Sequence, residues 1–540
     1  MFRTPASFAI GPAIASFVCT ALAIAAAWWW LGAPVELPKL DPGSHKLYCL
    51  SYAPFRGGQS PLVEGTRADA GQIDEDLALL AKYTDCIRTY SVDDGRDDVL
   101  ASARRHGLTV LHGIWASHDA DKTRRQIETT VGYAKDYPDV IKAIVVGNEV
   151  LLRGEMSAAT LSAIIRDVKA RVAMPVTYAD VWEFWLRNPD VQNAVDFVTV
   201  HILPYWEDFP IPAVRAAEHV ADIRGRVAAA FPDKEIVVGE FGWPSEGRMR
   251  EGARPSPSNQ ALALSETLAL AAREHFRLNV IEAFDQPWKR ALEGTVGGYW
   301  GIIDRAAGAP KFSFTGGPVS DHPNWPLQAL AGIVLAALAL GAACAGGAHR
   351  QVSAAQWAAI AGVTFLSAVA FGWTIETVGI ESFSIGSWLR SLAFALAAAA
   401  APVVCAAGTA AKRPAPAFAD LLGRHADRRD GLDWALGGIL IFTVIVAVEA
   451  ALGLVFDPRY RDIPFAPLTA AALPYLVLSV TAPRSGAARA VAESVAAALL
   501  VLCSCYILFN ESFANWQAAW FCASLVALAL SLARARDAPG

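Results

Sequence analysis

The chain has 540 residues, of which 54% are hydrophobic and only 18% are charged. A soluble domain carries roughly 25% charged residues, so this composition excludes a wholly soluble protein, and its hydrophobicity excludes a disordered one. The formal net charge of −6 excludes a broadly basic surface, so nucleic acid is not an expected partner.

The N-terminal segment, residues 1–37, contains a continuous apolar run over 8–31 that ends in three tryptophans. The apolar core of a secretory signal peptide spans only about 7–15 residues, and no small-x-small cleavage site follows this run. Tryptophans suit the interface of a membrane with water. We therefore expect an uncleaved membrane anchor, with a signal peptide as the alternative.

Residues 38–325 have the composition of a globular domain in which strand patterns alternate with helical patterns. The expected strands are Leu47–Ser51, Ile87–Tyr90, Leu108–Ile114, Ile141–Gly147, Val176–Ala179, Phe197–His201, Glu235–Gly239 and Asn279–Phe284. Eight strands with intervening helices over about 250 residues predict an α/β fold, a (β/α)8 TIM barrel. A doubly wound open sheet is the alternative, but the turn after Leu50 has no Gly-rich phosphate loop.

Two glutamates follow facing strands of this expected barrel, Glu149 after the fourth and Glu240 after the seventh. Residues at the carboxyl ends of barrel strands line the mouth where active sites lie. A pair of carboxylates cleaves glycosides, one as an acid and the other as a nucleophile or base. A separation of about 5–5.5 Å implies retention of configuration and about 6.5–9.5 Å implies inversion. The alternative for either glutamate alone is a surface residue or half of an ion pair.

These segments resemble glycoside hydrolase family 17, over about residues 45–310. The motifs that carry the resemblance are Gly147-Asn148-Glu149, Gly239-Glu240-Phe241-Gly242-Trp243-Pro244-Ser245, Pro204-Tyr205 and Phe284-Asp285-Gln286-Pro287-Trp288-Lys289. The resemblance implies a (β/α)8 barrel that hydrolyses or transfers β-1,3-glucans. An exported barrel joined to membrane helices resembles bacterial members associated with β-1,3/β-1,6-glucan synthesis.

The resemblance also implies residue roles, with Glu149 as the acid/base and Glu240 as the nucleophile. Asn148 would bond the 2-hydroxyl of the sugar at the cleavage point, an interaction that strengthens in the transition state. Tyr205 would lie near Glu240 and help to keep it ionised. Substrate binding is further assigned to Trp243, Trp288 and Lys289. No cofactor is expected.

The sequence departs from the family pattern at three places. Phe241 stands where the family often has threonine, and the first strand reads Leu50-Ser51-Tyr52-Ala53. Gln286 replaces an acidic residue of the family, which is expected to remove a charge near Lys289. We therefore expect a less charged mouth than the family has.

Arg88 and Tyr90 close the second expected strand and are assigned to substrate binding, with core packing as the alternative. The segment from Asp93 to Asp98 resembles a metal loop, but an Asp-rich helix N-terminus is the commoner explanation. The histidines show no metal-ligand spacing, so no metal is expected.

Residues 326–540 are expected to form an all-α domain of seven membrane-spanning helices. The apolar runs are 326–347, 354–374, 387–409, 433–455, 464–482, 489–508 and 514–533. With the anchor they make eight spans. Glu449 lies inside the fifth span and is either functional or directed to the membrane surface.

Basic residues fall in alternate loops, in one phase through all eight spans. The loops expected in the cytoplasm carry Arg350; Lys412, Arg413, Arg424, Arg428 and Arg429; Arg484 and Arg489; and Arg534 and Arg536. This pattern places both termini in the cytoplasm and the barrel outside. For a bacterial multi-pass protein of the inner (cell) membrane, the barrel would then be periplasmic.

Cys49 and Cys86 are the two cysteines of the exported domain, on strands expected to be adjacent. They could form a bridge, although two buried thiols are the more common arrangement. The other six cysteines fall in apolar spans, where cysteine behaves as a small hydrophobe.

These observations together predict a membrane-bound, retaining β-glucan glucanosyltransferase whose partners are β-glucan and the lipid bilayer. A glucan synthase or export partner is possible and unidentified. Endo-hydrolysis of β-1,3-glucan is the alternative activity. Two further alternatives are a processive nucleotide-sugar-dependent synthase, for which no Gln-x-x-Arg-Trp motif is present, and a non-catalytic glucan-binding or export protein.

Overall fold

The computed structural model describes residues 10–44, 46–93, 95, 97–348, 352–423, 429–482 and 491–534. The chain forms two compact units, one of Val35–Val319 and one of Met1–Pro34 with Ser320–Gly540. Each unit has its own hydrophobic core. Several residues of the sequence argument lie outside the described residues: Asp94, Arg96, Arg350, Arg424, Arg428, Arg484, Arg489 and Arg536.

The first unit is a closed barrel of eight parallel strands that neighbour one another in chain order. The strands are β2 (Cys49–Ser51), β3 (Cys86–Arg88), β4 (Thr109–Ile114), β5 (Ile141–Asn148), β6 (Val176–Val181), β7 (Val198–His201), β8 (Ile236–Phe241) and β9 (Leu278–Val280). Each corresponds to one of the expected strands, and β9 closes the barrel by pairing with β2. The predicted TIM barrel is confirmed, and the open sheet is excluded.

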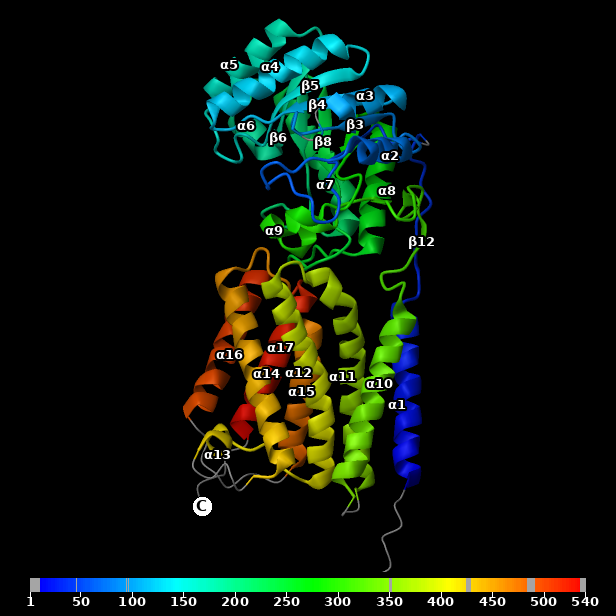
Figure 1. Cartoon of the computed structure of the whole chain (residues 1–540), viewed down its shortest axis with the longest axis vertical. Helices are drawn as coiled ribbons and strands as arrows, with labels where there is room; N and C mark the ends of the chain where they lie inside the picture. Colours follow the sequence, from blue (N-terminus) through cyan, green and yellow to red (C-terminus); the bar gives the residue numbers. More distant parts are fainter. Residues whose placement is uncertain are drawn as a thin grey trace, which may run out of the picture. The chain divides into compact units, whose positions relative to one another are not determined.

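Helices connect the barrel strands and surround them (Figure 1). They are α2 (Ala70–Leu80), α3 (Asp97–Arg105), α4 (Ala120–Asp136), α5 (Ala158–Arg171), α6 (Trp182–Arg187), α7 (Ala216–Ala230), α8 (Pro257–Glu274) and α9 (Arg290–Glu293). Sequence explains α5 well, because Ser157 caps its first turn and Leu161, Ile165 and Val168 recur at helical spacing on its buried face.

A disulfide joins Cys49 on β2 to Cys86 on β3, with 4.4 Å between the Cα atoms. The bridge, rather than two buried thiols, is therefore the arrangement found. It links neighbouring strands at the point where the barrel begins. In the loop-closure model a bridge across 37 residues stabilises the folded state by about 4 kcal/mol.

The second unit is helical. Its elements are α1 (Ile10–Leu31), α10 (Trp325–Gly346), α11 (Ala354–Glu381), α12 (Ile385–Ala411), α13 (Phe418–Leu422), α14 (Gly431–Phe456), α15 (Phe465–Thr481), α16 (Val491–Glu511) and α17 (Trp516–Arg534). In Figure 1, α1 (blue) lies alongside α10 (green). Glu449 on α14 is half exposed and lies 3.6 Å from Arg461.

Seven helices among the described residues are long and apolar enough to cross a membrane. The expected span over 464–482 corresponds to α15, which has 17 residues and is shorter than the others. Large apolar side chains such as Leu338, Ile445 and Phe509 are exposed on these helices. An exposed apolar surface of this kind suits contact with lipid rather than water.

Candidate active site

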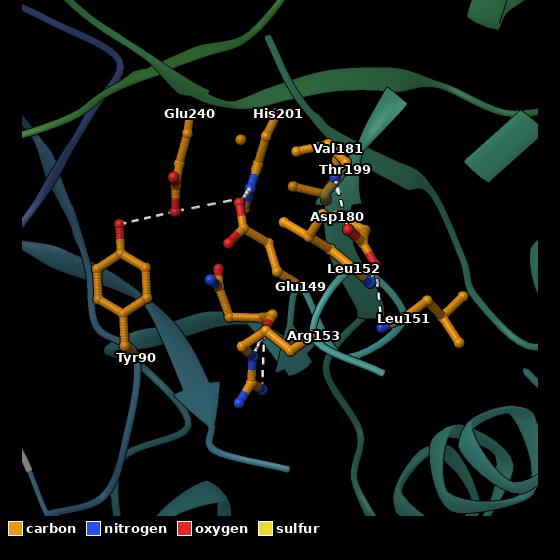
Figure 2. Close-up of polar contacts among 12 residues, drawn as sticks. Tyr90, Glu149, Leu151, Leu152, Arg153, Asp180, Val181, Thr199, His201 and Glu240 are labelled. Atoms are coloured by element: carbon orange, nitrogen blue, oxygen red, sulfur yellow. Dashed lines mark hydrogen bonds and ion pairs between the residues drawn. The ribbon is translucent and has the colours of Figure 1, made fainter. Parts of the chain in front are cut away.

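Glu240 lies on β8 with its carboxylate buried at the barrel mouth (Figure 2). Its Oε1 accepts a hydrogen bond of 2.9 Å from the Tyr90 hydroxyl and one of 3.0 Å from Arg88 Nη1. Arg88 ends β3 and is itself only 1% exposed. Two donors, one of them always charged, therefore hold this carboxylate in one orientation.

Glu149 follows β5 in an unusual backbone conformation, with φ of +53°. Few residues other than glycine occupy this left-handed region, and such residues gather at functional sites. The backbone N–H of Glu149 donates to the Ala179 carbonyl at 2.8 Å, and its carbonyl accepts from Arg153 N–H at 2.9 Å. These bonds fix the turn that presents the Glu149 side chain.

Asp180 on β6 stabilises the same turn. Its carboxylate accepts from the backbone N–H groups of Leu151 and Leu152 at 3.2 and 3.4 Å, and also from the Tyr178 hydroxyl. Burial raises the pKa of Asp180 to about 6, although the hydrogen bonds from the Tyr178 hydroxyl and the Val181 N–H oppose the increase. Asp180 is therefore a structural partner of Glu149 rather than a third reacting group.

His201 ends β7 and lies between the two glutamates (Figure 2). Its Nδ1 is 2.9 Å from Glu149 Oε1, and its Nε2 is 3.5 Å from Glu240 Oε1. A carboxylate oxygen of Glu149, one of Glu240 and a ring nitrogen of His201 lie within 4.8 Å of one another. The two carboxylates are thus close enough to act on one sugar.

The electrostatics of Glu149 follow from these contacts. Burial would raise the pKa of Glu149, but the hydrogen bond and charge of His201, with the charges of Arg88 and Arg153, lower it. Two carboxylates and a histidine could also attract a metal ion. Here the guanidinium of Arg88 already provides positive charge at Glu240.

Asn148 is held by the same arginine. Its Oδ1 accepts a hydrogen bond of 2.6 Å from Arg88 Nη2. Since arginine can only donate, this contact fixes which end of the amide is the oxygen. The amide NH2 is therefore the group that Asn148 can offer to a sugar hydroxyl, as the role expected for it requires.

Two aromatic residues do not lie where the resemblance placed them. The Tyr205 hydroxyl donates to the Arg248 carbonyl at 2.9 Å, and the hydroxyl beside Glu240 is that of Tyr90. Trp243 is fully buried, and its indole N–H donates to the Arg254 carbonyl at 3.0 Å. Without an exposed face Trp243 cannot stack on a sugar, so its assignment to substrate binding is corrected to core packing.

The charge expected to be missing near Lys289 is present. The Lys289 ammonium pairs with Glu282, which follows β9 and is buried. Burial raises the pKa of Glu282 to about 7, and Lys289 opposes this. A carboxylate therefore lies beside Lys289 although position 286 is an amide.

Gln286 instead orients Trp288. Its Oε1 accepts from the Trp288 indole N–H at 2.8 Å, while its Nε2 donates to the Ala53 carbonyl at 3.1 Å. Trp288 also meets Phe55 edge to face, with 6.4 Å between ring centroids. Trp288 is partly exposed, so it remains available to a sugar.

Three residues of the site carry no role in the sequence argument, namely His201, Asp180 and Glu282. Each stands at or just after the carboxyl end of a strand. A charged or ionisable side chain at such a position was the available signal.

In the acidic segment from Asp93 to Asp98, Asp93 accepts a hydrogen bond of 2.8 Å from Gln126, and α3 begins at Asp97.

A closed (β/α)8 barrel with two glutamates together at its mouth defines a glycosidase-type enzyme domain. Comparisons with known proteins agree. Residues 49–301 match the family described as BtgE/BtgC glycoside hydrolase domain. The chain is 25% identical over 267 residues to a glucan 1,3-β-glucosidase of Saccharomyces cerevisiae, covering 44% of this chain and 84% of that protein. It is 29% identical over 237 residues to one of Schizosaccharomyces pombe, covering 40% and 72%.

Among solved structures, a family 17 β-1,3-glucanosyltransferase from Rhizomucor miehei shares 23% identity at a TM-score of 0.44, over 50% of this chain and 97% of that one. The resemblance indicated by the motifs is thus confirmed by the family and the curated relatives. The barrel is similar to glycoside hydrolase domains of the glucan 1,3-β-glucosidase type.

Proposed function

We propose that this protein is a membrane-bound, retaining β-glucan glucanosyltransferase that acts on β-1,3- or β-1,6-glucans during glucan synthesis outside the cytoplasm. The observation that carries the proposal is the closeness of the two carboxylates, whose oxygens lie within 4.8 Å. Retaining enzymes place their carboxyl groups about 5–5.5 Å apart, which leaves no room for an attacking water between carboxylate and sugar.

In the first step Glu240 attacks the anomeric carbon while Glu149 gives a proton to the leaving glycosidic oxygen. A glucan bound through an ester to Glu240 results. In the second step Glu149 takes the proton of an incoming hydroxyl, the new glycosidic bond forms and the Glu240 carboxylate leaves. The Asn148 amide suits a contact with the 2-hydroxyl.

The acceptor in the second step is a sugar hydroxyl in a transferase and water in a hydrolase. Tethering to a membrane favours the transferase, because an enzyme beside an emerging glucan meets acceptor chains at high local concentration. The endo-hydrolase is the second candidate, and the glucosidase names of the relatives favour it.

A location outside the cytoplasm belongs to the same proposal. The Cys49–Cys86 disulfide supports it, because such bridges persist in oxidising compartments and are rare in the cytosol. The membrane-capable helices and the basic residues of alternate loops support cytoplasmic termini and a periplasmic barrel of an inner-membrane protein.

The test is product analysis with the full chain in detergent and a short β-1,3-glucan of defined length. Transfer is expected to yield chains longer than the starting material within the first few per cent of conversion. If only shorter sugars form, even at high acceptor concentration, the protein is a hydrolase and not a transferase. A Glu240→Gln protein prepared in parallel controls for contaminating glycosidases.

A further inference from the structure

The ring of His201 is enclosed so that it can adopt only one position. The side chain has no exposed surface, and β8 passes directly beside it. A Cβ on Gly239 would lie 3.2 Å from His201 Cδ2 and 2.3 Å from Thr199 Cγ2. The glycine at 239 therefore lets the backbone of β8 approach closely, and this approach holds the ring between the two glutamates.

The proton of the ring can be placed from its neighbours. Arg88 Nη1 lies 3.3 Å from His201 Nε2, but it already donates to the Gly239 carbonyl and to Glu240 Oε1, so this contact does not place the ring proton. The ionised carboxylate of Glu149 can only accept a hydrogen bond, so the ring nitrogen that faces it, Nδ1, carries a proton. That N–H donates to Glu149 Oε1 at 2.9 Å.

We infer that His201 is a positioning residue that couples the two glutamates. Its Nδ1 holds Glu149, and its Nε2 lies beside Arg88, the cation that pairs with Glu240. This inference rests on the two-glutamate function proposed above. The charged groups that face the ring are Arg88 from β3, Glu149 after β5 and Glu240 from β8, and the charge of Asp180 on β6 acts on it as well.

The coupling depends on the charge of Glu240, which changes during the reaction. Before the reaction, Arg88 and the His201 ring contact two carboxyl groups, those of Glu240 and Glu149. When the Glu240 oxygen bonds to the anomeric carbon, the bond to the leaving oxygen breaks and Glu149 gives that oxygen its proton. The charge of Glu240 disappears, so Arg88 and His201 then face one carboxylate, that of Glu149.

Glu149 is thereby stabilised as the base that the second step requires. When the acceptor hydroxyl attacks, its proton passes to Glu149 and the Glu240 carboxylate is regenerated. His201 keeps its proton throughout. The histidine thus helps one residue to be an acid in the first step and a base in the second, without any movement of the chain.

Two matched variants separate the two contacts of the ring. In His201→Asn the amide nitrogen replaces Nδ1 and keeps a donor for Glu149. In His201→Gln the amide group reaches the position of Nε2 and the donor to Glu149 is lost. Both are uncharged and smaller or similar in size, so a general packing defect would affect them alike.

The first experiment measures kcat/KM against pH for both variants of the full chain, with laminari-oligosaccharides as substrates. Loss of the donor raises the pKa of Glu149, so the basic limb of His201→Gln is expected about one pH unit higher than wild type. The basic limb of His201→Asn is expected to stay in place. A basic limb at the same pH in all three proteins would overturn the inference.

A second measurement needs no substrate. Infrared titration follows the protonated carboxyl band that is absent from Glu149→Gln, and its midpoint is expected to rise by about one pH unit in His201→Gln only. Equal midpoints would again overturn the coupling. If the wild type turns over no glucan, the proposed function fails while the infrared midpoints still decide the role of His201.

Discussion

Arg88 Nη1 and Glu240 Oε1 lie 3.0 Å apart, although 152 residues separate them in the chain. Both side chains are almost fully buried, at 1% and 5% exposure. The same guanidinium also donates to the Gly239 carbonyl at 2.7 Å and to Asn148 at 2.6 Å. One arginine on β3 therefore fixes the position of groups contributed by β5 and β8.

Replacing Arg88 with methionine should leave the Glu240 carboxylate buried without its cation. Breaking such a pair costs about 3–5 kcal/mol, and the loss of a positioned charge should lower kcat by at least about 100-fold. Arg88→Lys keeps the charge but cannot donate to all of the same acceptors at once. It should therefore retain most of the stability and still lose activity, which thermal unfolding and kinetics together would measure. A fully active Arg88→Met would contradict this account.

Glu240→Gln should abolish turnover, because a neutral amide cannot attack the anomeric carbon. Glu149→Gln should lose about 10²–10⁴-fold on glucans but retain the first step on aryl glucosides whose leaving group needs no proton. Initial rates and the burst of released phenol measure both effects. Glu235→Gln is a matched control, because this exposed glutamate precedes the same strand β8 at the opposite end of the barrel. Wild-type activity in Glu240→Gln would refute the assignment.

Removing the bridge by Cys49→Ala with Cys86→Ala should lower the free energy of unfolding of the barrel by about 4 kcal/mol in the loop-closure model. Neither cysteine contacts the two glutamates, so activity below the unfolding transition should remain. Chemical denaturation with and without reductant measures the difference. The reductant should shift the midpoint of the wild type and leave that of the double variant unchanged. A shift of equal size in both proteins would count against the bridge.

His112 on β4 provides a pH-dependent term in stability. Burial lowers its pKa to about 4, and its unfolded value is about 6.5. The unfolded chain therefore binds this proton first, so the stabilising contribution is complete above about pH 6.5 and disappears as the pH falls towards 4. The difference corresponds to about 3 kcal/mol. Denaturation midpoints of wild type and His112→Gln, measured between pH 7 and pH 4, should converge at low pH. Parallel curves would show that His112 is not the titrating group.

The barrel and its two glutamates could be predicted because they are local features. Each strand is a short apolar run, and each glutamate directly follows or ends one. The order of the strands therefore places Glu149 and Glu240 at one mouth. The sequence allows the bridge between Cys49 and Cys86 only as an alternative, because adjacency of two strands does not establish that two sulfur atoms meet.

The partners of these glutamates could not be predicted in the same way. Which hydroxyl reaches Glu240 depends on how β3 and β7 pack, so Tyr90 occupies the place expected for Tyr205. The contact between Lys289 and Glu282 depends on the path of the chain after β9. Tyr90 and Glu240 are 150 residues apart in the chain, and the contact of Glu282 with Lys289 needs a particular turn between them. A motif in one segment contains no information about either orientation.

Gln286→Glu restores the acidic residue of the family pattern and should nevertheless impair this protein. The amide nitrogen of Gln286 donates to the Ala53 carbonyl, whereas a carboxylate would place its oxygen against that carbonyl in a buried position. A buried acceptor without a donor costs about 1–3 kcal/mol. The displaced side chain should also release Trp288, so KM for long β-1,3-glucans should rise several-fold while kcat on a small aryl glucoside stays close to wild type. Gln192→Glu, on the partly exposed turn Pro189–Asn193, is the control and should change neither constant. If Gln286→Glu instead improved glucan binding, the charge at this position would matter more than the orientation of Trp288.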